Sequence, residues 1–137
     1  MKIEELENPP QWLLDADTVF ENVEIIDGIV HWNGGVWKEG VWHNGVWKDG
    51  TWLDGVWYDG IWENGTWYGG TWQNGIWYGG TWKGGIWLNG VWNGGYWLDG
   101  VWNYGRWLGG YWRGGKWEKG YRWKNQLVSS DTPPSND

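Results

Sequence analysis

The chain contains no cysteine, which excludes disulfide bonds, thiolate zinc sites and a cysteine nucleophile. It has only one phenylalanine and one methionine, so the sequence does not predict an ordinary mixed hydrophobic core. Proline is scarce, at four residues, and the 26 glycines follow no Gly-X-Y triplet, which argues against a collagen-like helix. With 137 residues, the chain is long enough for one domain.

Long apolar runs and an excess of positive charge are missing as well. No stretch approaches the roughly 18 consecutive apolar residues of a membrane-spanning helix, and the acidic N-terminus lacks the apolar segment of a signal peptide. The net charge is −7 and the pI about 4.7, which disfavours a protein that reads a nucleic-acid backbone. We therefore expect no membrane and no nucleic-acid partner, and we expect the acidity to keep an aromatic-rich surface in solution.

Tryptophan and glycine dominate what is present, with 20 and 26 residues. Tryptophan recurs at every fifth position from Trp32 to Trp117, which defines 18 five-residue units with tryptophan at position 2. Position 5 is glycine in every unit, position 4 is Asn, Asp or Gly in 15 units, and position 1 is Val, Ile or Thr in 13. This pattern favours short strands joined by turns, whereas a glycine at every fifth residue would cost a helix about 1 kcal/mol each. We predict an all-β repeat protein.

The first arrangement that fits is a narrow antiparallel β-hairpin ribbon of five-residue units. Positions 3 to 5 would form a loop closed by a left-handed glycine, and positions 1 and 2 would form minimal strands. Successive loops would lie on opposite edges, which requires a ten-residue hairpin period at position 3. The sequence has that period: position 3 is mostly Tyr or Leu in every second unit and mostly polar in the units between them. We therefore predict an apolar interaction edge made by Tyr58, Tyr68, Tyr78, Leu88, Leu98 and Leu108.

A β-solenoid is the alternative arrangement. Glycine and tryptophan two residues apart, from Gly35/Trp37 through Gly115/Trp117, resemble the small and large residues of pentapeptide-repeat proteins. That resemblance implies a right-handed four-sided β-solenoid. The sequence departs from the family by using Trp where the family has Leu or Phe, and by placing nine Val or Ile residues at position 1, where the family has polar residues.

The limits of the repeat divide the chain into three segments. They are an N-terminal arm and capping hairpin over residues 1–31, the repeat domain over 32–123, and a disordered tail over 124–137. In the first segment, the stretch QWLLDAD predicts a short helix or docking arm. Residues 18–32 predict a hairpin that turns at Asp27-Gly28 and covers the open edge of the repeat.

Residues suited to catalysis or ligand binding are few. His31 and His43 are the only histidines, and both occupy repeat positions filled elsewhere by ordinary residues. Asp49, Asp54 and Asp59 would supply the oxygen atoms of a calcium ladder, but Asn and Gly replace Asp at the same position, which favours simple turn formation. No phosphate-binding loop, nucleophile elbow or metalloprotease motif occurs. We predict no enzyme activity, no cofactor and no metal site.

Runs such as GTWxNG and GVWxDG over residues 34–120 resemble the Gly/Trp-rich five-residue repeat proteins of tailed bacteriophages. The resemblance implies a virion component, found in the virion or in the host cytoplasm during assembly, with further copies or virion proteins as partners. We accordingly expect a non-enzymatic structural or interaction protein. The alternative is a module that binds polysaccharide or cell-wall glycan on Trp and Tyr faces, since NGTWYGG is similar to the aromatic hairpins of choline- and glucan-binding modules.

Overall fold

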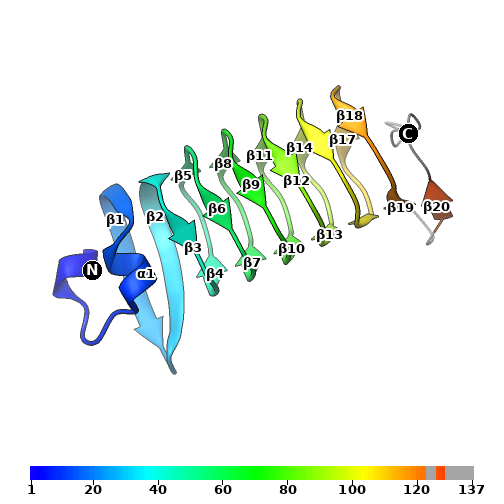
Figure 1. Cartoon of the computed structure of the whole chain (residues 1–137). Coiled ribbons are helices and arrows are strands. Elements are labelled where there is room, and N and C mark those ends of the chain that lie inside the picture. The colour runs from blue at the N-terminus through cyan, green and yellow to red at the C-terminus, as the bar shows by residue number, and fades with distance from the viewer. Residues whose placement is uncertain (123–125, 129–137) are drawn as a thin grey trace.

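The computed structural model describes residues 1–122 and 126–128, and its repeat is a β-solenoid (Figure 1). Each two-residue strand of the inner coils pairs in parallel with the strands three units before and three units after it. Trp77, for example, is in register with Trp62 on one side and Trp92 on the other. One coil therefore contains three five-residue units, and about six coils stack along a single axis.

The three units of a coil form the three faces of the solenoid. Face 1 contains β2 (Ile29–Glu39), β4 (Val46–Trp47), β7 (Ile61–Trp62), β10 (Ile76–Trp77), β13 (Val91–Trp92), β16 (Arg106–Trp107) and β19 (Gly120–Arg122). Face 2 begins with the second half of β2 and continues with β5 (Thr51–Trp52), β8 (Thr66–Trp67), β11 (Thr81–Trp82), β14 (Tyr96–Trp97) and β17 (Tyr111–Trp112). Face 3 contains β3 (Val41–Trp42), β6 (Val56–Trp57), β9 (Thr71–Trp72), β12 (Ile86–Trp87), β15 (Val101–Trp102) and β18 (Lys116–Trp117).

The core consists of three files of stacked indoles, one behind each face. All 18 repeat tryptophans are buried, with exposed fractions of 0–5%. Equivalent indoles of successive coils stack with ring centroids 4.6–5.0 Å apart and planes within 3–7°, which matches the spacing of hydrogen-bonded strands. Consecutive tryptophans meet edge to face at 5.7–6.0 Å and 70–76°, the other favourable aromatic geometry. Each file thus contacts both others, which closes the core around the axis.

Backbone hydrogen bonds tie every coil to the one before it. The amide of position 1 donates to the carbonyl of a corner glycine, as Thr66 does to Gly50 at 3.0 Å. The amide of position 3 donates to the carbonyl of a tryptophan, as Tyr68 does to Trp52 at 2.8 Å. Both bonds skip the intervening units of the chain, so they can form only when the units of one face lie in successive coils.

The corners explain why position 5 is always glycine. These glycines have φ values from +102° to +150°, a region that residues with a side chain rarely adopt. Space is also lacking: a methyl group on Gly75 would overlap the carbonyl oxygen of Gly60 in the preceding coil. At many corners the preceding Asn or Asp accepts the glycine amide, as Asp49 does from Gly50 at 2.8 Å.

The N-terminal segment caps the first coil. The helix α1 (Gln11–Leu14) follows a short 3-10 turn, η1 (Ile3–Glu5), and the strand β1 (Asp17–Ile26) pairs antiparallel with β2. The hairpin turn falls at Asp27-Gly28, where both residues have positive φ. Leu13 and Val23 are fully buried against the indole core, so the cap extends the core beyond the repeat.

The prediction of an all-β repeat is confirmed, and the solenoid alternative is the arrangement observed. The antiparallel hairpin ribbon is wrong, because units pair with the next coil in parallel and not with their sequence neighbours. The solenoid has three sides where the pentapeptide-repeat resemblance implied four. In the tail predicted as disordered, residues 126–128 form β20 (Gln126–Val128), antiparallel to β19, and residues 124–125 and 129–137 lie outside the described residues.

Candidate interaction surfaces

The outward side chain at position 1 gives each face its own character. On face 1, four consecutive coils present Val46, Ile61, Ile76 and Val91, all partly exposed, which we call the aliphatic ridge. His31 precedes the ridge and Arg106 follows it in the same file. Comparing position 1 residues fifteen apart in the sequence would have identified this file. The predicted ten-residue period groups other residues together and therefore misses it.

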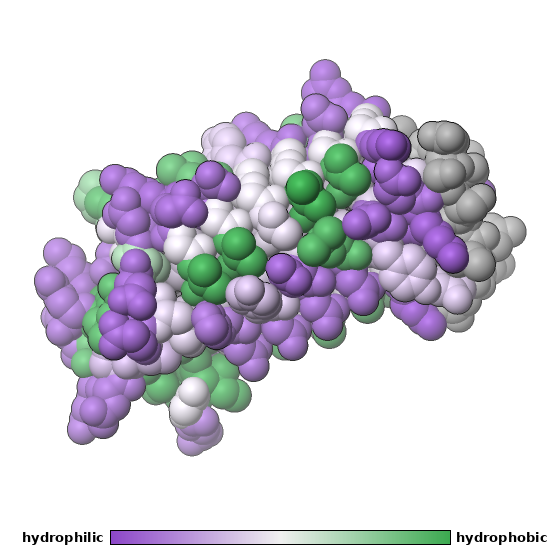
Figure 2. Space-filling model, in the orientation of Figure 1, coloured by the Kyte–Doolittle hydropathy of each residue, from purple (hydrophilic) through white to green (hydrophobic). Residues whose placement is uncertain are grey.

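Faces 2 and 3 are less uniformly apolar. Face 2 presents Thr51, Thr66 and Thr81 and then Tyr96 and Tyr111, whose rings lie 6.1 Å apart. Face 3 presents Val41 and Val56, then Thr71, then Ile86 and Val101. Figure 2 shows hydrophobic clusters separated by a paler region on the side where β3, β6, β9 and β12 lie. The threonine therefore divides the apolar surface of face 3.

The predicted interaction edge does not exist as one edge. One coil contains fifteen residues, so residues spaced by ten fall on different faces. Tyr78 and Leu108 lie on face 1, Tyr68 and Leu98 on face 2, and Tyr58 and Leu88 on face 3. On faces 1 and 3, polar residues separate the large ones within the position 3 file, whereas on face 2 Tyr68 has Leu53 on one side and Lys83 on the other. Lys83 lies over the Tyr68 ring, with its ammonium 4.6 Å from the centroid, and His43 lies 5.6 Å from Tyr58. The sequence period is real, but it separates the apolar residues.

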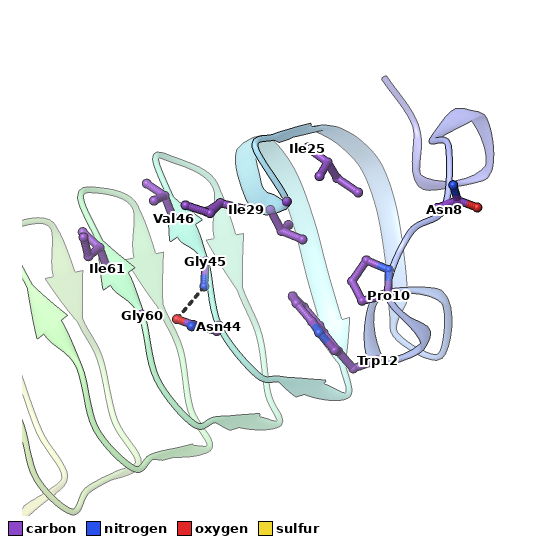
Figure 3. A pocket seen from close by; sticks show the side chains of 12 residues that line it. Asn8, Pro10, Trp12, Ile25, Ile29, Asn44, Gly45, Val46, Gly60 and Ile61 are labelled. Atoms are coloured by element: carbon purple, nitrogen blue, oxygen red, sulfur yellow. Dashed lines mark hydrogen bonds between the residues drawn. The ribbon is translucent and has the colours of Figure 1, made fainter.

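A groove of about 460 Å³ lies between the N-terminal cap and the first coils (Figure 3). Its lining is mainly apolar and includes Pro10, Trp12, Ile25, Ile29, Val46 and Ile61. The Trp12 indole forms one wall and packs against Trp42 at 5.1 Å and His43 at 5.8 Å. Val46 and Ile61 also belong to the aliphatic ridge, so the groove borders face 1. Sequence reasoning missed it, since it depends on where the cap meets the coils.

Phe20 is the most exposed large apolar residue of the described chain, at 80%. Its φ is +58°, which is uncommon for a residue with a side chain. It lies at an irregularity between Val19 and Asn22, where β1 follows β2 around the corner between faces 1 and 2. The strain therefore accompanies the bend of the cap.

The titratable residues are dispersed over the surface. Asp49, Asp54 and Asp59 lie at three different corners. Each carboxylate accepts a hydrogen bond of 2.8 Å from the backbone amide of the glycine that follows it, which supports the turn explanation. Among the described residues, no three His, Asp or Glu side chains come together as metal ligands. His31 and His43 belong to different files, on faces 1 and 3. Near the C-terminal end, a hydrogen bond with Tyr121 raises the pKa of Tyr104.

Charge is distributed unevenly along the solenoid axis. Residues 1–30, which form the cap, contain eight Asp or Glu and one Lys. Residues 31–80 contain five acidic and two basic residues, whereas residues 81–122 contain two acidic and six basic residues. The N-terminal end is therefore strongly negative and the C-terminal coils are positive.

Comparison with known proteins gives no relative: no family model, no curated protein and no solved structure matches the chain. Across the part of the chain that is described, no helix has the length and apolar character needed to cross a bilayer. The function must therefore be inferred from the surfaces themselves.

Proposed function

We propose that the protein is a non-enzymatic scaffold, a rigid solenoid that holds interaction surfaces at fixed distances from one another. The observation that carries the proposal is the unbroken core: three files of indoles run through every coil of the repeat, each fully or almost fully buried. Stacked aromatic files and two ladder bonds per unit leave few internal degrees of freedom. Such a rigid molecule keeps the partners bound to its surfaces at fixed distances from one another.

The dispersal of the polar groups supports a passive role. Catalysis needs an acid, a base or a nucleophile that converge on one point, usually in a concave site. The groove beside the cap is lined mostly by aliphatic residues, proline and one indole, with Asn8 and Asn44 as its polar side chains. That lining is suited to contact with another molecule more than to proton transfer.

As a finer proposal, the scaffold belongs to a bacteriophage particle and binds other protein subunits there. Its support is the resemblance of the repeat to phage Gly/Trp-rich proteins. The test is to isolate the assembly that contains the protein and to measure its copies per particle by quantitative mass spectrometry. A fixed stoichiometry is expected for a structural part, and a variable, substoichiometric amount would contradict the proposal.

Glycan binding is the second candidate function, and the exposed tyrosines favour it. The repeat indoles are buried, so sugar rings would stack on Tyr58, Tyr68, Tyr78, Tyr96, Tyr104 and Tyr111, which are 37–57% exposed. Isothermal titration with host polysaccharide should then give a binding signal that Tyr96→Ala with Tyr111→Ala reduces. A scaffold should give no signal. Quenching of the buried tryptophans is not expected in either case.

A further inference from the structure

The aliphatic ridge is symmetric along the solenoid axis. Read from either end, its four rungs are Val, Ile, Ile and Val, and the midpoint lies between Ile61 and Ile76. Face 2 has no such file because Thr51, Thr66 and Thr81 occupy the same rungs, and Thr71 interrupts face 3. Face 1 is thus the face best suited to pack against an identical copy in reverse orientation.

The charge distribution selects the same orientation. The acidic cap and first coils of one copy would repel those of a parallel neighbour, and the basic coils 81–122 would repel each other too. In an antiparallel pair, each acidic end lies beside a basic end, so the long-range electrostatic interaction becomes attractive.

Simple geometry adds a third argument. When two identical faces superpose in antiparallel fashion, the two-fold axis runs across the face, and each file meets its own counterpart. When they superpose in parallel fashion, the axis runs along the solenoid, and the ridge meets the position 3 file instead. On face 1, that file contains Lys48, Glu63, Tyr78 and Asn93, which would place charges against the ridge.

We propose that two copies of the protein associate face to face and antiparallel through the aliphatic ridge, with the two-fold axis between Ile61 and Ile76. The proposal rests on the scaffold function and identifies one partner as a second copy. Val46 then lies opposite the partner's Val91, and His31 lies opposite the partner's Arg106. Glu24 is the neighbour of His31 across β1 and β2, so a carboxylate lies one rung from that guanidinium.

The size of the face sets the expected strength. Six rungs at about 4.8 Å give a face about 29 Å long and one unit wide, which is at the small end of specific protein contacts. We expect a reversible dimer in the micromolar range, and we expect higher ionic strength to weaken it because the ends contribute through charge.

Analytical ultracentrifugation over a concentration series tests the surface. Ile76→Lys places a charge on the ridge and should raise the dissociation constant at least about tenfold. Ile86→Lys makes the same change at the same repeat position on face 3, and it should leave the constant within about twofold of the wild type. A wild-type protein that stays monomeric, or equal effects of the two substitutions, would overturn the proposal.

Cross-linking tests the orientation, and the absence of cysteine makes it clean. Packed sheets lie about 10 Å apart, so a thiol-specific cross-linker of about that span is used. Val46→Cys and Val91→Cys variants should each cross-link poorly alone, because like positions lie three rungs apart, or about 14 Å along the axis. An equal mixture should cross-link efficiently. Self-linking of Val46→Cys alone, or no gain on mixing, would contradict the antiparallel arrangement.

These outcomes are separable from the scaffold function. A protein that is monomeric yet present at fixed stoichiometry in a larger assembly would overturn the dimer and leave the scaffold in place. A protein that dimerises through the ridge but has no fixed stoichiometry in any assembly would overturn the scaffold function and leave the dimer in place.

Discussion

At the scale of single residues, the invariant glycine and the buried tryptophan solve two different problems. The glycine adopts a backbone conformation that side chains disfavour, and it lets the next coil approach within hydrogen-bonding distance. The tryptophan supplies nearly all of the buried apolar surface. The sequence predicted both roles correctly, because each is local: a positive-φ turn and a large apolar residue are visible in one five-residue unit.

The corner explanation predicts that Gly75→Ala lowers the free energy of unfolding by more than about 1 kcal/mol. Its φ is +121°, and the new methyl group would overlap the Gly60 carbonyl. Urea unfolding followed by circular dichroism measures the change.

Gly79 provides the matched control for Gly75. It occupies position 4 of the next unit, and a methyl group there would lie at an ordinary contact distance of 3.6 Å from the Glu63 carbonyl oxygen. Gly79→Ala should therefore change the free energy of unfolding by less than about 0.5 kcal/mol. If the two substitutions destabilise equally, the corner explanation is incorrect.

At the scale of the strand and the file, stability comes from repetition across coils. A two-residue strand has little adhesion of its own, but each one is held on both sides by the equivalent strands of the coils before and after it. Outside the core, polar residues separate the large position 3 residues of faces 1 and 3, as Gln73 separates Tyr58 from Leu88 on face 3. This alternation limits the size of any exposed apolar patch.

The core files predict a large cost for removing one indole. Trp72→Ala should destabilise the fold by about 3–5 kcal/mol, because a fully buried ring stacked on Trp57 and Trp87 is lost. Tyr78→Ala removes a ring that is 51% exposed and should cost less than about 1 kcal/mol. Thermal unfolding of both variants checks the difference, and similar losses would argue against the buried files.

The alternation within files predicts the effect of Gln73→Leu. This change joins Tyr58 and Leu88 into a continuous apolar strip on face 3, so we expect stronger nonspecific association at high concentration. Gln73→Ser keeps the position polar and serves as the control. Static light scattering measures the association, and equal behaviour of the two variants would show that the alternation has no such role.

At the scale of the whole molecule, the number of sides and the pairing of coils decide what the surface looks like. The cap could be predicted, since the Asp27-Gly28 turn and the QWLL helix are local signals. The number of units per coil could not be predicted in the same way, because one five-residue unit carries no information about which other unit it pairs with. The predicted edge from Tyr58 to Leu108 failed for this reason, although every third unit repeats Thr51, Thr66 and Thr81 in a way that indicates a fifteen-residue coil.

The central claim is that the five-residue units wind into a coil and do not form a ribbon, and a distance within one chain tests it most directly. Leu53→Cys with Arg113→Cys places two spin labels on face 2, twelve units and four coils apart. Pulsed electron paramagnetic resonance on labelled protein diluted in unlabelled protein should give a distance of about 19 Å, broadened by the label linkers. An antiparallel ribbon would place twelve strand spacings between the labels, and a distance of about 58 Å would contradict the account.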